Sequence, residues 1–258
     1  MNINEAFKII NNSKNITFVT GAGISKSSGI PTFHNKDDIS IWDTFKKFST
    51  WDLIEYSIFN NPTKCKDFFL SFIEPIASAK PTKAHNIISK LQNFKNVNII
   101  TQNIDGLHNL NNDISVVEIH GTIFNIIYLY NDNPTYNITQ NDLKRICNKL
   151  EKFNVINTKL LLQIIKPILE CKDNIIIKRP DIIMFGDIID EYKYRQIQRY
   201  LINTDCIIKI GLLTDSYYNG NSYTPTISIN PNKNHNNNIK LSADEALNQI
   251  YDKMLSNI

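Results

Sequence analysis

Apolar and polar positions follow two periods along this chain, one typical of strands and one typical of helices. Short apolar runs predict buried strands, whereas apolar residues spaced three and four apart predict amphipathic helices. The expected strands lie at residues 15–19, 97–100, 115–119, 181–184, 206–210 and 226–229, and the expected helices at residues 3–12, 82–93, 191–202 and from Ser242 onward. Strands that alternate with helices indicate an α/β fold with a parallel, doubly wound sheet.

Two stretches interrupt this alternation. Residues 38–79 have a helical pattern rich in aromatic residues, which we expect to pack in a core, and residues 121–180 hold helix-like runs at 140–152 and 157–170. We therefore expect a large domain and a second, smaller lobe built from two insertions. The large domain would comprise residues 1–33, 81–120 and 181–258, and the helical small lobe residues 34–80 and 121–180.

Composition and charge narrow the class of protein only moderately. The 28 Lys and Arg residues against 25 Asp and Glu give a net charge of +3, which favours a mildly basic surface over a nucleic-acid-binding one. No apolar run reaches the length of a membrane span, and the N-terminus lacks a basic, acid-poor targeting pattern. Four isolated cysteines are typical of a reduced compartment. We expect an intracellular, cytoplasmic protein without nucleic-acid or membrane partners, and the oligomeric state stays open.

Polar chemistry follows three of the expected strands. A glycine turn follows residues 15–19, the run Thr-Gln-Asn-Ile-Asp-Gly-Leu-His at residues 101–108 follows 97–100, and a His-Gly pair follows 115–119. Open α/β sheets bind ligands at the carboxyl ends of their strands, so this set indicates a nucleotide enzyme. The glycine turn alone does not decide the matter. Lys26 occupies the place of the third glycine of the dinucleotide fingerprint, and an ordinary strand-to-helix turn fits equally well.

Taken together, these segments resemble the sirtuin family of NAD-dependent protein deacylases. The likeness covers most of the chain in order, through residues 21–25, 28–33, 101–108, 120–121, 179–187, 210–211, 227–230 and 242–244. It implies a Rossmann-type large domain, NAD as the cofactor, and an acylated-lysine protein or peptide as the substrate. The implied activity is lysine deacylation with release of nicotinamide and O-acyl-ADP-ribose.

The resemblance implies a cofactor-binding role for each matching residue of the large domain. Gly21, Ala22 and Gly23 would cradle the pyrophosphate, Phe33 would shield the reacting sugar, Gln102 would bind ribose hydroxyls, Ile104 would pack on the nicotinamide and Asp105 would accept a hydrogen bond from its amide. Gly211, Asn230 and Ala243 would complete this set. Asn103 would order the ribose and a water, and it counts as catalytic as well as cofactor-binding.

The same resemblance assigns the general base and the peptide-binding segment. His120 would remove a proton from a ribose hydroxyl, a task that suits an imidazole because it titrates near neutrality. Met184, Phe185 and Gly186 would belong to an edge strand that holds the substrate peptide by β-augmentation. His108 would be a scaffold residue, and His85 and His235 carry no functional expectation.

The first departure from the family pattern concerns metal. Sirtuins usually carry two Cys-x-x-Cys pairs between the His-Gly and Arg-Pro-Asp segments, and these pairs form a tetrahedral zinc site. This chain has only Cys147 and Cys171 there, and neither has a partner at that spacing. Isolated thiols in apolar surroundings are typical of core residues. We therefore expect no zinc and a small lobe held by apolar packing.

Further departures lie at the cofactor site itself. His34 stands where the family has Arg, and Leu212 and Leu213 stand where it has Thr and Ser, so anchoring contacts should be lost unless Thr214 or Ser216 compensates. Thr32 is shared with a branch that includes enzymes for acidic acyl groups. The helix before residue 81 has no arginine to bind such a group, which favours an apolar acyl pocket.

Two alternatives to a deacylase remain open at this point. An NAD-glycohydrolase or ADP-ribosyltransferase would share the nicotinamide-cleavage chemistry of Gln102, Asn103 and Asp105. A non-catalytic NAD or ADP-ribose sensor is motivated by His34 and by the pair Leu212-Leu213. Nicotinamide release from NAD, with and without an acetylated peptide, separates the three.

Overall fold

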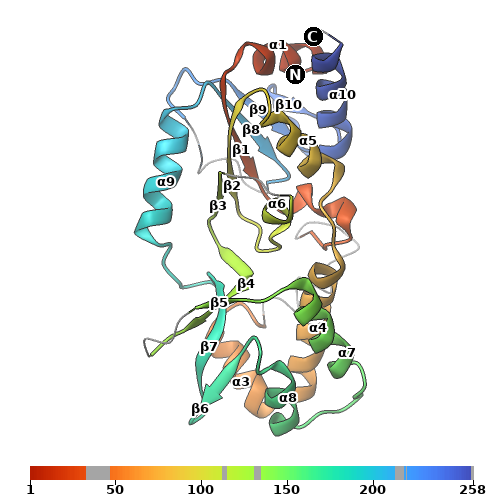
Figure 1. Ribbon diagram of the computed structural model, residues 1–258, viewed down its shortest axis with the longest axis vertical. Helices are drawn as coiled ribbons and strands as arrows, with labels where there is room; N and C mark the ends of the chain where they lie inside the picture. The colour runs from red at the N-terminus through yellow and green to blue at the C-terminus, as the bar shows by residue number, and fades with distance from the viewer. Residues whose placement is uncertain (33–46, 112–114, 131–134, 213–217, 219, 257–258) are drawn as a thin grey trace. The chain divides into compact units, whose positions relative to one another are not determined.

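The chain divides into two compact units, and the second is formed by two segments that interrupt the first. The computed structural model describes residues 1–32, 47–111, 115–130, 135–212, 218 and 220–256. The first unit comprises Met1–Thr32, Lys80–Ile119 and Ile189–Ile258, and the second comprises Phe33–Ala79 and His120–Ile188 (Figure 1).

A parallel sheet of six strands forms the centre of the first unit, in the order β10-β9-β8-β1-β2-β3. Its strands are β1 (Asn15–Thr20), β2 (Asn96–Thr101), β3 (Val116–Glu118), β8 (Cys206–Ile210), β9 (Thr226–Ile229) and β10 (Asn238–Ile239). The central strand β1 pairs in parallel with β2 on one side and with β8 on the other. The chain winds from β1 outward to β3 and later returns on the opposite side of β1. The topological switch point of the sheet therefore lies between β1 and β8, where such folds bind ligands.

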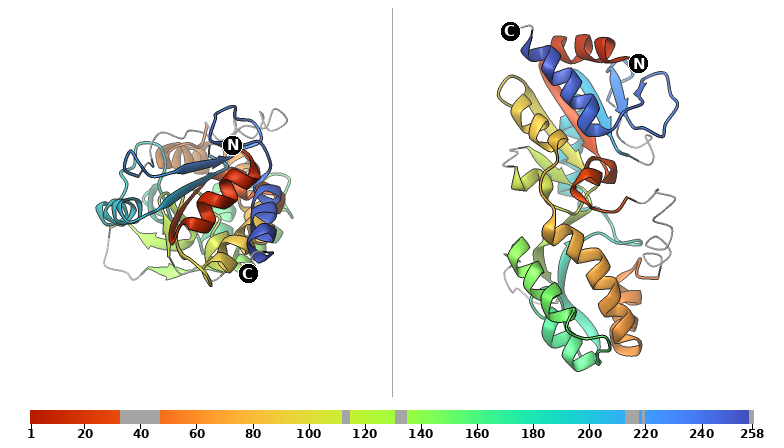
Figure 2. Two further views of the ribbon diagram at one scale, coloured as in Figure 1. Left: turned by 90° about the horizontal axis from the view of Figure 1, so that it is seen from above. Right: turned by 90° about the vertical axis from the view of Figure 1, so that its right-hand side faces the viewer.

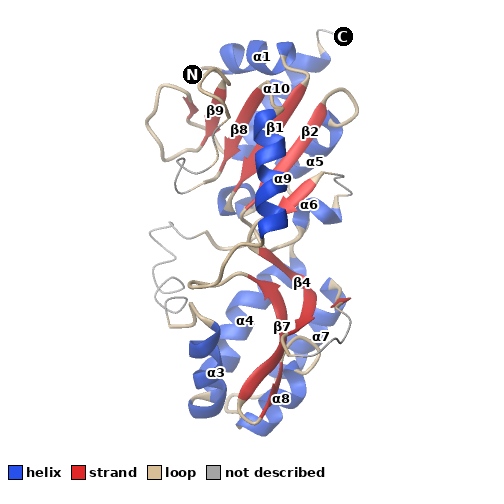
Figure 3. Cartoon of the chain, turned by 90° about the vertical axis from the view of Figure 1, so that its left-hand side faces the viewer, coloured by secondary structure: helices blue, strands red, loops and turns tan. Residues whose placement is uncertain are grey.

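Helices cover both faces of this sheet, as the expected doubly wound fold requires. The helices are α1 (Ile3–Asn12), α5 (Lys83–Leu91), α6 (Leu107–Leu110), α9 (Glu191–Ile202) and α10 (Ala243–Leu255), and two short 3₁₀ turns, η1 (Ala22–Ile24) and η2 (Lys26–Ser28), follow β1. Helices α1 and α10 lie side by side (Figure 2). Together with α5 they enclose a core that includes Phe18 and Ile208, whereas α9 crosses the other face and packs on Val19 and Ile100 (Figure 3). Successive strand residues point to opposite faces, so one apolar strand supplies both cores.

The second unit contains an antiparallel sheet of four strands in the order β5-β4-β7-β6. Its strands are β4 (Gly121–Tyr128), β5 (Tyr136–Asn137), β6 (Glu170–Lys172) and β7 (Ile175–Ile182), and its described helices are α3 (Trp51–Asn60), α4 (Pro62–Ser78), α7 (Gln140–Leu150) and α8 (Thr158–Ile165). Two expectations were wrong here. The small lobe is a mixture of helices and strands, and the strand expected at residues 181–184 is the end of β7, which pairs with β4 and β6 instead of joining the parallel sheet.

The ammonium group of Lys178 on β7 contacts residues of the other three strands of the small sheet. The side chain is 5% exposed, and its Nζ lies 3.2 Å from Glu170 of β6 and donates to the Lys166 carbonyl at 2.5 Å. The same Nζ lies 5.8 Å from the ring centroid of Tyr128 on β4 and 5.9 Å from that of Tyr136 on β5. A buried cation that is paired, hydrogen-bonded and flanked by aromatic faces has its charge compensated. Each of the four strands therefore contributes a residue to one charged centre.

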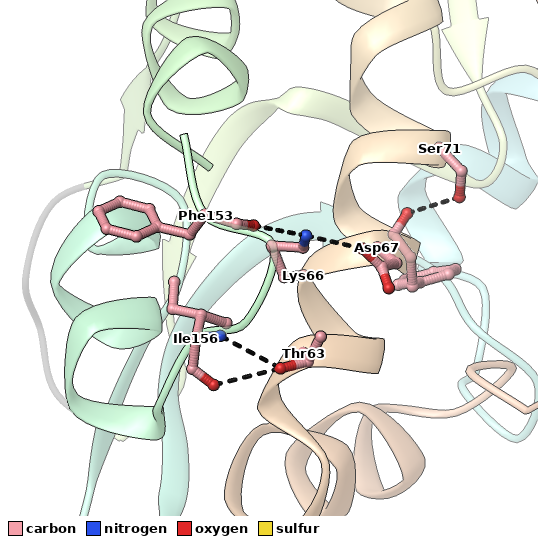
Figure 4. A network of polar contacts seen from close by, with 7 residues as sticks. Thr63, Lys66, Asp67, Ser71, Phe153 and Ile156 are labelled. Atoms are coloured by element: carbon pink, nitrogen blue, oxygen red, sulfur yellow. Dashed lines mark hydrogen bonds and ion pairs between the residues drawn. The ribbon is translucent and has the colours of Figure 1, made fainter. Parts of the chain in front are cut away.

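A second polar network fastens the connection between α7 and α8 to helix α4 (Figure 4). Lys66 is buried on α4, where its Nζ donates to the Phe153 carbonyl at 2.8 Å and lies 2.9 Å from Asp67. Thr63 exchanges hydrogen bonds with the backbone of Ile156. These contacts satisfy carbonyl and amide groups of a connecting segment, which helical bonds cannot do.

The aromatic residues of the first insertion pack in a core, as their pattern predicts. Phe48 stacks on Phe68 with ring centroids 4.1 Å apart, and Phe68 stacks on Phe72 at 5.7 Å. Phe48, Phe68 and Phe69 are buried. Trp42 and Phe45, which belong to the same pattern, lie outside the described residues.

Candidate functional site

The glycine turn after β1 is pressed against the end of β8. The N–H of Gly21 donates to the Ile210 carbonyl at 3.0 Å, and the N–H of Gly23 donates to the Gly211 carbonyl at 3.1 Å. A Cβ placed on Gly23 would lie 2.5 Å from the Cα of Gly211, and a Cβ on Gly211 would lie 2.4 Å from the Cα of Gly23. Only two glycines permit backbones to come this close. The N–H groups of Gly21 and Gly23 donate to carbonyls of the protein itself. These glycines therefore contribute to the site through their lack of side chains, which lets the two backbones come close.

The run after β2 brings its polar side chains to the glycine turn. The Asn103 amide donates from Nδ2 to the Gly21 carbonyl and to the Ser25 hydroxyl, each at 3.2 Å. Ser25 Oγ in turn donates to Asp105 Oδ2 at 2.7 Å, and the Leu107 N–H donates to Asp105 Oδ1 at 3.0 Å. The structure thus joins two of the predicted site residues, Asn103 and Asp105, through Ser25. Gln102 and Ile104 lie beside them in the same run and are half-buried.

Ser25 is a residue of this cluster that the sequence did not single out. It is fully buried and links the segment after β1 to the segment after β2. Its place in the Gly-Ala-Gly-Ile-Ser run is the only sequence signal that points to it. The pairing with residues about 80 positions away is not readable from local pattern.

Asp105 is a carboxylate held inside the protein by hydrogen bonds. It is 5% exposed, and burial raises the pKa of its carboxyl group, an effect that the hydrogen bonds from Leu107 and Ser25 oppose. The bond from the Leu107 N–H, two residues onward, also gives Asp105 an Asx-turn just before α6. The side chain therefore has a structural function whatever it does for a ligand.

Two buried histidines lie beside this cluster. His108 Nε2 lies 3.1 Å from Thr20 Oγ1, and its ring centroid lies 4.5 Å from that of His85. His85 is fully buried, its Nδ1 accepts from the Thr82 N–H at 3.2 Å, and its Nε2 has no hydrogen-bond partner among the described residues. Burial lowers the pKa of His85 to about 2, and the neighbouring His108 adds to that shift. His85 is therefore neutral in the folded protein.

The remaining predicted cofactor residues follow β8 and β9. The Gly211 N–H donates to the Ile229 carbonyl at 3.2 Å, and the Asn230 amide donates to the Leu212 carbonyl at 3.2 Å. Leu212 is 3% exposed and packs in the core under α9, so its side chain contributes apolar packing. Ala243 is buried at the first position of α10.

Several other predicted residues belong to the second unit or lie outside the described residues. His120 is half-buried, and its carbonyl accepts from the Ile183 N–H at 2.9 Å. The edge strand expected at Met184, Phe185 and Gly186 is absent, because these described residues form a turn. In it the Met184 N–H donates to Asp187 Oδ2 at 3.0 Å and the Asp187 N–H donates to the Met184 carbonyl at 3.1 Å. The residues outside the described ones are Phe33, His34, Leu213, Thr214 and Ser216.

The arrangement at the end of β1 occurs in a chain that matches a known family. The sequence model of the Sir2 family matches residues 21–217, so the chain belongs to the Sir2 family, which confirms the sirtuin resemblance. The chain is 34% identical over 211 residues to "NAD-dependent protein deacylase 1" of Caldanaerobacter subterraneus subsp. tengcongensis, a match that covers 80% of this chain and 76% of that protein. It is 28% identical over 207 residues to "NAD-dependent protein deacetylase" of Clostridium tetani, which covers 79% of this chain and 74% of the relative.

Solved structures with the same fold include complexes of Sir2 proteins with ligands. A Sir2 homologue–NAD complex has a TM-score of 0.72 at 21% identity and covers 98% of this chain and 94% of its own. A Sir2–p53 peptide–NAD+ complex has a TM-score of 0.68 at 22% identity and covers 99% of this chain and 100% of its own. These likenesses confirm the predicted α/β fold.

Two features that would point to other kinds of site do not occur in the described part of the chain. Among the described residues no helix is long and apolar enough to cross a membrane. The same residues include no group of three or more His, Cys, Asp and Glu side chains that could hold a metal ion.

The contact between Gly23 and Gly211 predicts that adding one methyl group at Gly211 lowers the stability of the protein. Gly211→Ala should lower the free energy of unfolding by about 3 kcal/mol, because the new Cβ meets backbone and the residue has a φ of +62°. Gly29→Ala is the matched control, since Gly29 has a φ of +83° but open space around its Cα, and it should cost about 1 kcal/mol. Urea denaturation measures both values, and equal losses would show that the close approach is unimportant.

The neutral state of His85 predicts a loss of stability in mild acid. Its folded pKa of about 2 lies below the unfolded value near 6.5. Between these values the unfolded chain binds the additional proton, so the unfolding free energy falls as the pH falls. The raised pKa of Asp105 acts in the opposite direction, because it favours the folded state as that carboxylate becomes protonated.

The effect of His85 should amount to about 1.5 kcal/mol between pH 6.5 and pH 5.0. His85→Asn keeps an acceptor near the Thr82 N–H and should remove most of this dependence. His235→Asn, at an exposed position, should leave it unchanged. Denaturation series at several pH values measure the slopes, and a wild-type slope retained in His85→Asn would contradict the assignment.

Proposed function

We propose that this protein is an NAD-dependent protein-lysine deacylase that releases nicotinamide and O-acyl-ADP-ribose. The observation that carries the proposal is the Asn103–Ser25–Asp105 cluster beside the Gly23–Gly211 contact, at the switch point of a parallel sheet. Family membership and relatives named as deacylases and deacetylases support the same activity.

The residues present fit NAD as the cofactor. The glycine turn offers a backbone surface without side chains at the switch point, which suits a pyrophosphate. Asn103 and Asp105 supply amide and carboxylate groups whose orientations are fixed by Ser25. When bound, NAD would supply an electrophilic ribose carbon and nicotinamide as the leaving group. Gln102, Asn230 and Ala243 are the further residues that would hold it.

Asp105 is suited to orient a ligand amide because it is already held in place. Each carboxylate oxygen accepts one internal hydrogen bond and keeps a second lone pair for an additional donor. Two internal bonds fix the side chain before any ligand arrives, so little conformational entropy is lost on binding. Asn103 is held in the same way by Gly21 and Ser25.

His120 is proposed as the general base, and Met184, Phe185 and Gly186 as peptide-contacting residues. An imidazole can take a proton from a ribose hydroxyl near neutral pH, and the backbone of His120 is anchored by Ile183. Phe185 presents a side chain that is 72% exposed, an apolar surface available to a substrate peptide. A similar fold binds a p53 peptide together with NAD+ in the Sir2–p53 peptide–NAD+ complex, which supports a peptide substrate.

We also propose an intracellular location. All four cysteines are free thiols, which is typical of reducing compartments. Dependence on NAD agrees with this location.

The deacylase proposal predicts peptide-dependent nicotinamide release. Wild-type protein incubated with NAD and an acetylated peptide should release nicotinamide and free lysine. His120→Ala should reduce deacylation by about 10²–10⁴-fold with the melting temperature unchanged. Mass spectrometry of the peptide, with nicotinamide measured in parallel, gives both quantities. Release that does not depend on peptide would support a glycohydrolase instead, and binding without release would support a sensor.

The second unit is proposed to fold without zinc. Cys147 on α7 is buried, and burial raises the pKa of its thiol to about 11. Burial likewise raises the pKa of the Cys171 thiol on β6 to about 12. Zinc binds thiolates. A raised pKa keeps both thiols protonated near neutral pH, which disfavours them as zinc ligands. The buried ammonium of Lys178 provides an organising centre of another kind for the same sheet.

This proposal predicts that Lys178, and not a metal, controls the stability of the second unit. Elemental analysis should find no stoichiometric zinc, and a chelator should leave the melting temperature unchanged. Lys178→Met should lower the unfolding free energy by about 2 kcal/mol, because it removes a hydrogen-bonded buried charge. Lys172→Met, at an exposed position of β6, is the control and should have little effect. One tightly held zinc per chain would refute the proposal.

A further inference from the structure

We propose that Asp244 is a positioning residue that locks the turn after β1 into its cofactor-binding conformation, an inference that rests on the proposed NAD-dependent function. Asp244 is the second residue of α10 and follows Ala243, a predicted cofactor contact. Its carboxylate joins three elements of the first unit that are far apart in sequence. No local motif of the sequence assigns it this task.

The two carboxylate oxygens of Asp244 bind two different segments. Oδ2 accepts from the Ser27 hydroxyl at 2.6 Å, and Ser27 belongs to η2, which follows the glycine turn. Oδ1 accepts from the Ala84 N–H at 2.7 Å, in the first turn of α5. Both bonds are charge-assisted and short, which places them among the stronger hydrogen bonds in proteins.

Asp244 is not required to cap its own helix. That function belongs to Ser242 and Glu245, which form a reciprocal capping box at the start of α10. The negative charge of Asp244 nevertheless lies in the first turn of α10 and at the first turn of α5, where helix dipoles favour an anion. The carboxylate is therefore held by its own helix and serves as the acceptor for the other two segments.

A neighbouring bond adds a second anchor between η2 and the segment before α5. The Ser28 hydroxyl donates to the Lys80 carbonyl, so Ser27 and Ser28 are both tied to the region 80–84, the first of them through Asp244. The segment that starts at Gly21 is thus fixed at both ends. Gly23 holds it to Gly211 at the start, and Ser27 and Ser28 hold it at the end.

A loop fixed at both ends binds a ligand with less loss of conformational entropy than a loop fixed at one end. Loss of the Asp244 bridge should weaken NAD binding in the ground state and the transition state alike. Such a loss of uniform binding raises KM and leaves kcat unchanged. Asp244 acts on the cofactor only through Ser27 and Ala84, without touching a reacting atom.

The experiment uses three test variants: Ser27→Ala, Asp244→Asn and the double variant that combines these two changes. Asp252→Asn is the control. Asp252 also lies on α10, where its carboxylate accepts from Asn248 on the exposed side of the same helix, so it controls for loss of a carboxylate on that helix. Steady-state kinetics at saturating acetylated peptide give KM for NAD and kcat. Amide hydrogen exchange of residues 23–29 in the protein without NAD measures the turn itself, since the N–H groups of Gly23, Ile24, Ser25, Ser28 and Gly29 are hydrogen-bonded.

Ser27→Ala should raise KM for NAD about three- to tenfold and accelerate exchange of these amides by a similar factor. Asp244→Asn should do both to a greater extent, the double variant should add little to it, and Asp252→Asn should match the wild type. Unchanged exchange in Ser27→Ala and Asp244→Asn would overturn the proposal, as would a fall in kcat without a change in KM. If the wild type releases no nicotinamide from NAD, the deacylase proposal fails, and the exchange measurement still decides whether Asp244 positions the turn.

Discussion

The contact between the backbones of Gly23 and Gly211 is the constraint on which the first unit depends. It closes the space between the ends of β1 and β8, the two strands on either side of the switch point. Once these backbones touch, the segment after β1 cannot move toward β8. The Gly21 carbonyl and the Ser25 hydroxyl are then in place to receive the Asn103 amide. Because Gly23 and Gly211 have no side chains, their backbones can touch, and this contact places the segment on which the polar cluster forms.

From that point the site is organised by hydrogen bonds between segments that follow different strands. Ser25 connects Asn103 with Asp105, and His108 connects the same run with Thr20 at the end of β1. The Ser25–Asp105 and Thr20–His108 bonds are buried, so they lie in surroundings of low dielectric constant, where an unmade bond would be costly. This explains why a cluster with few members can hold a carboxylate inside the protein.

The sequence predicted the parts of this structure that have local signals. Alternating strands and helices indicated the doubly wound sheet, and the polar run after β2 contains Asn103 and Asp105, which the structure joins through Ser25. Strand β7 was misjudged because its inward positions are Ile176, Lys178, Pro180 and Ile182, and a lysine and a proline conceal the alternation of an apolar strand. The helix expected at residues 157–170 ends at Ile165, which agrees with the exclusion of Pro167 from a helix interior. The hydrogen bonds of Ser25 and Asp244 could not be predicted, because their partners lie about 80 to 220 positions away and bonds at such distances leave no periodic trace.

The charged centre of the small sheet has a consequence for how the second unit is assembled. A metal clip has to be loaded after synthesis, and it ties the folding of a unit to the metal supply and to the oxidation state of several thiols. A lysine arrives with the polypeptide, so the contacts of Lys178 with residues of the other three strands form without any group added after synthesis.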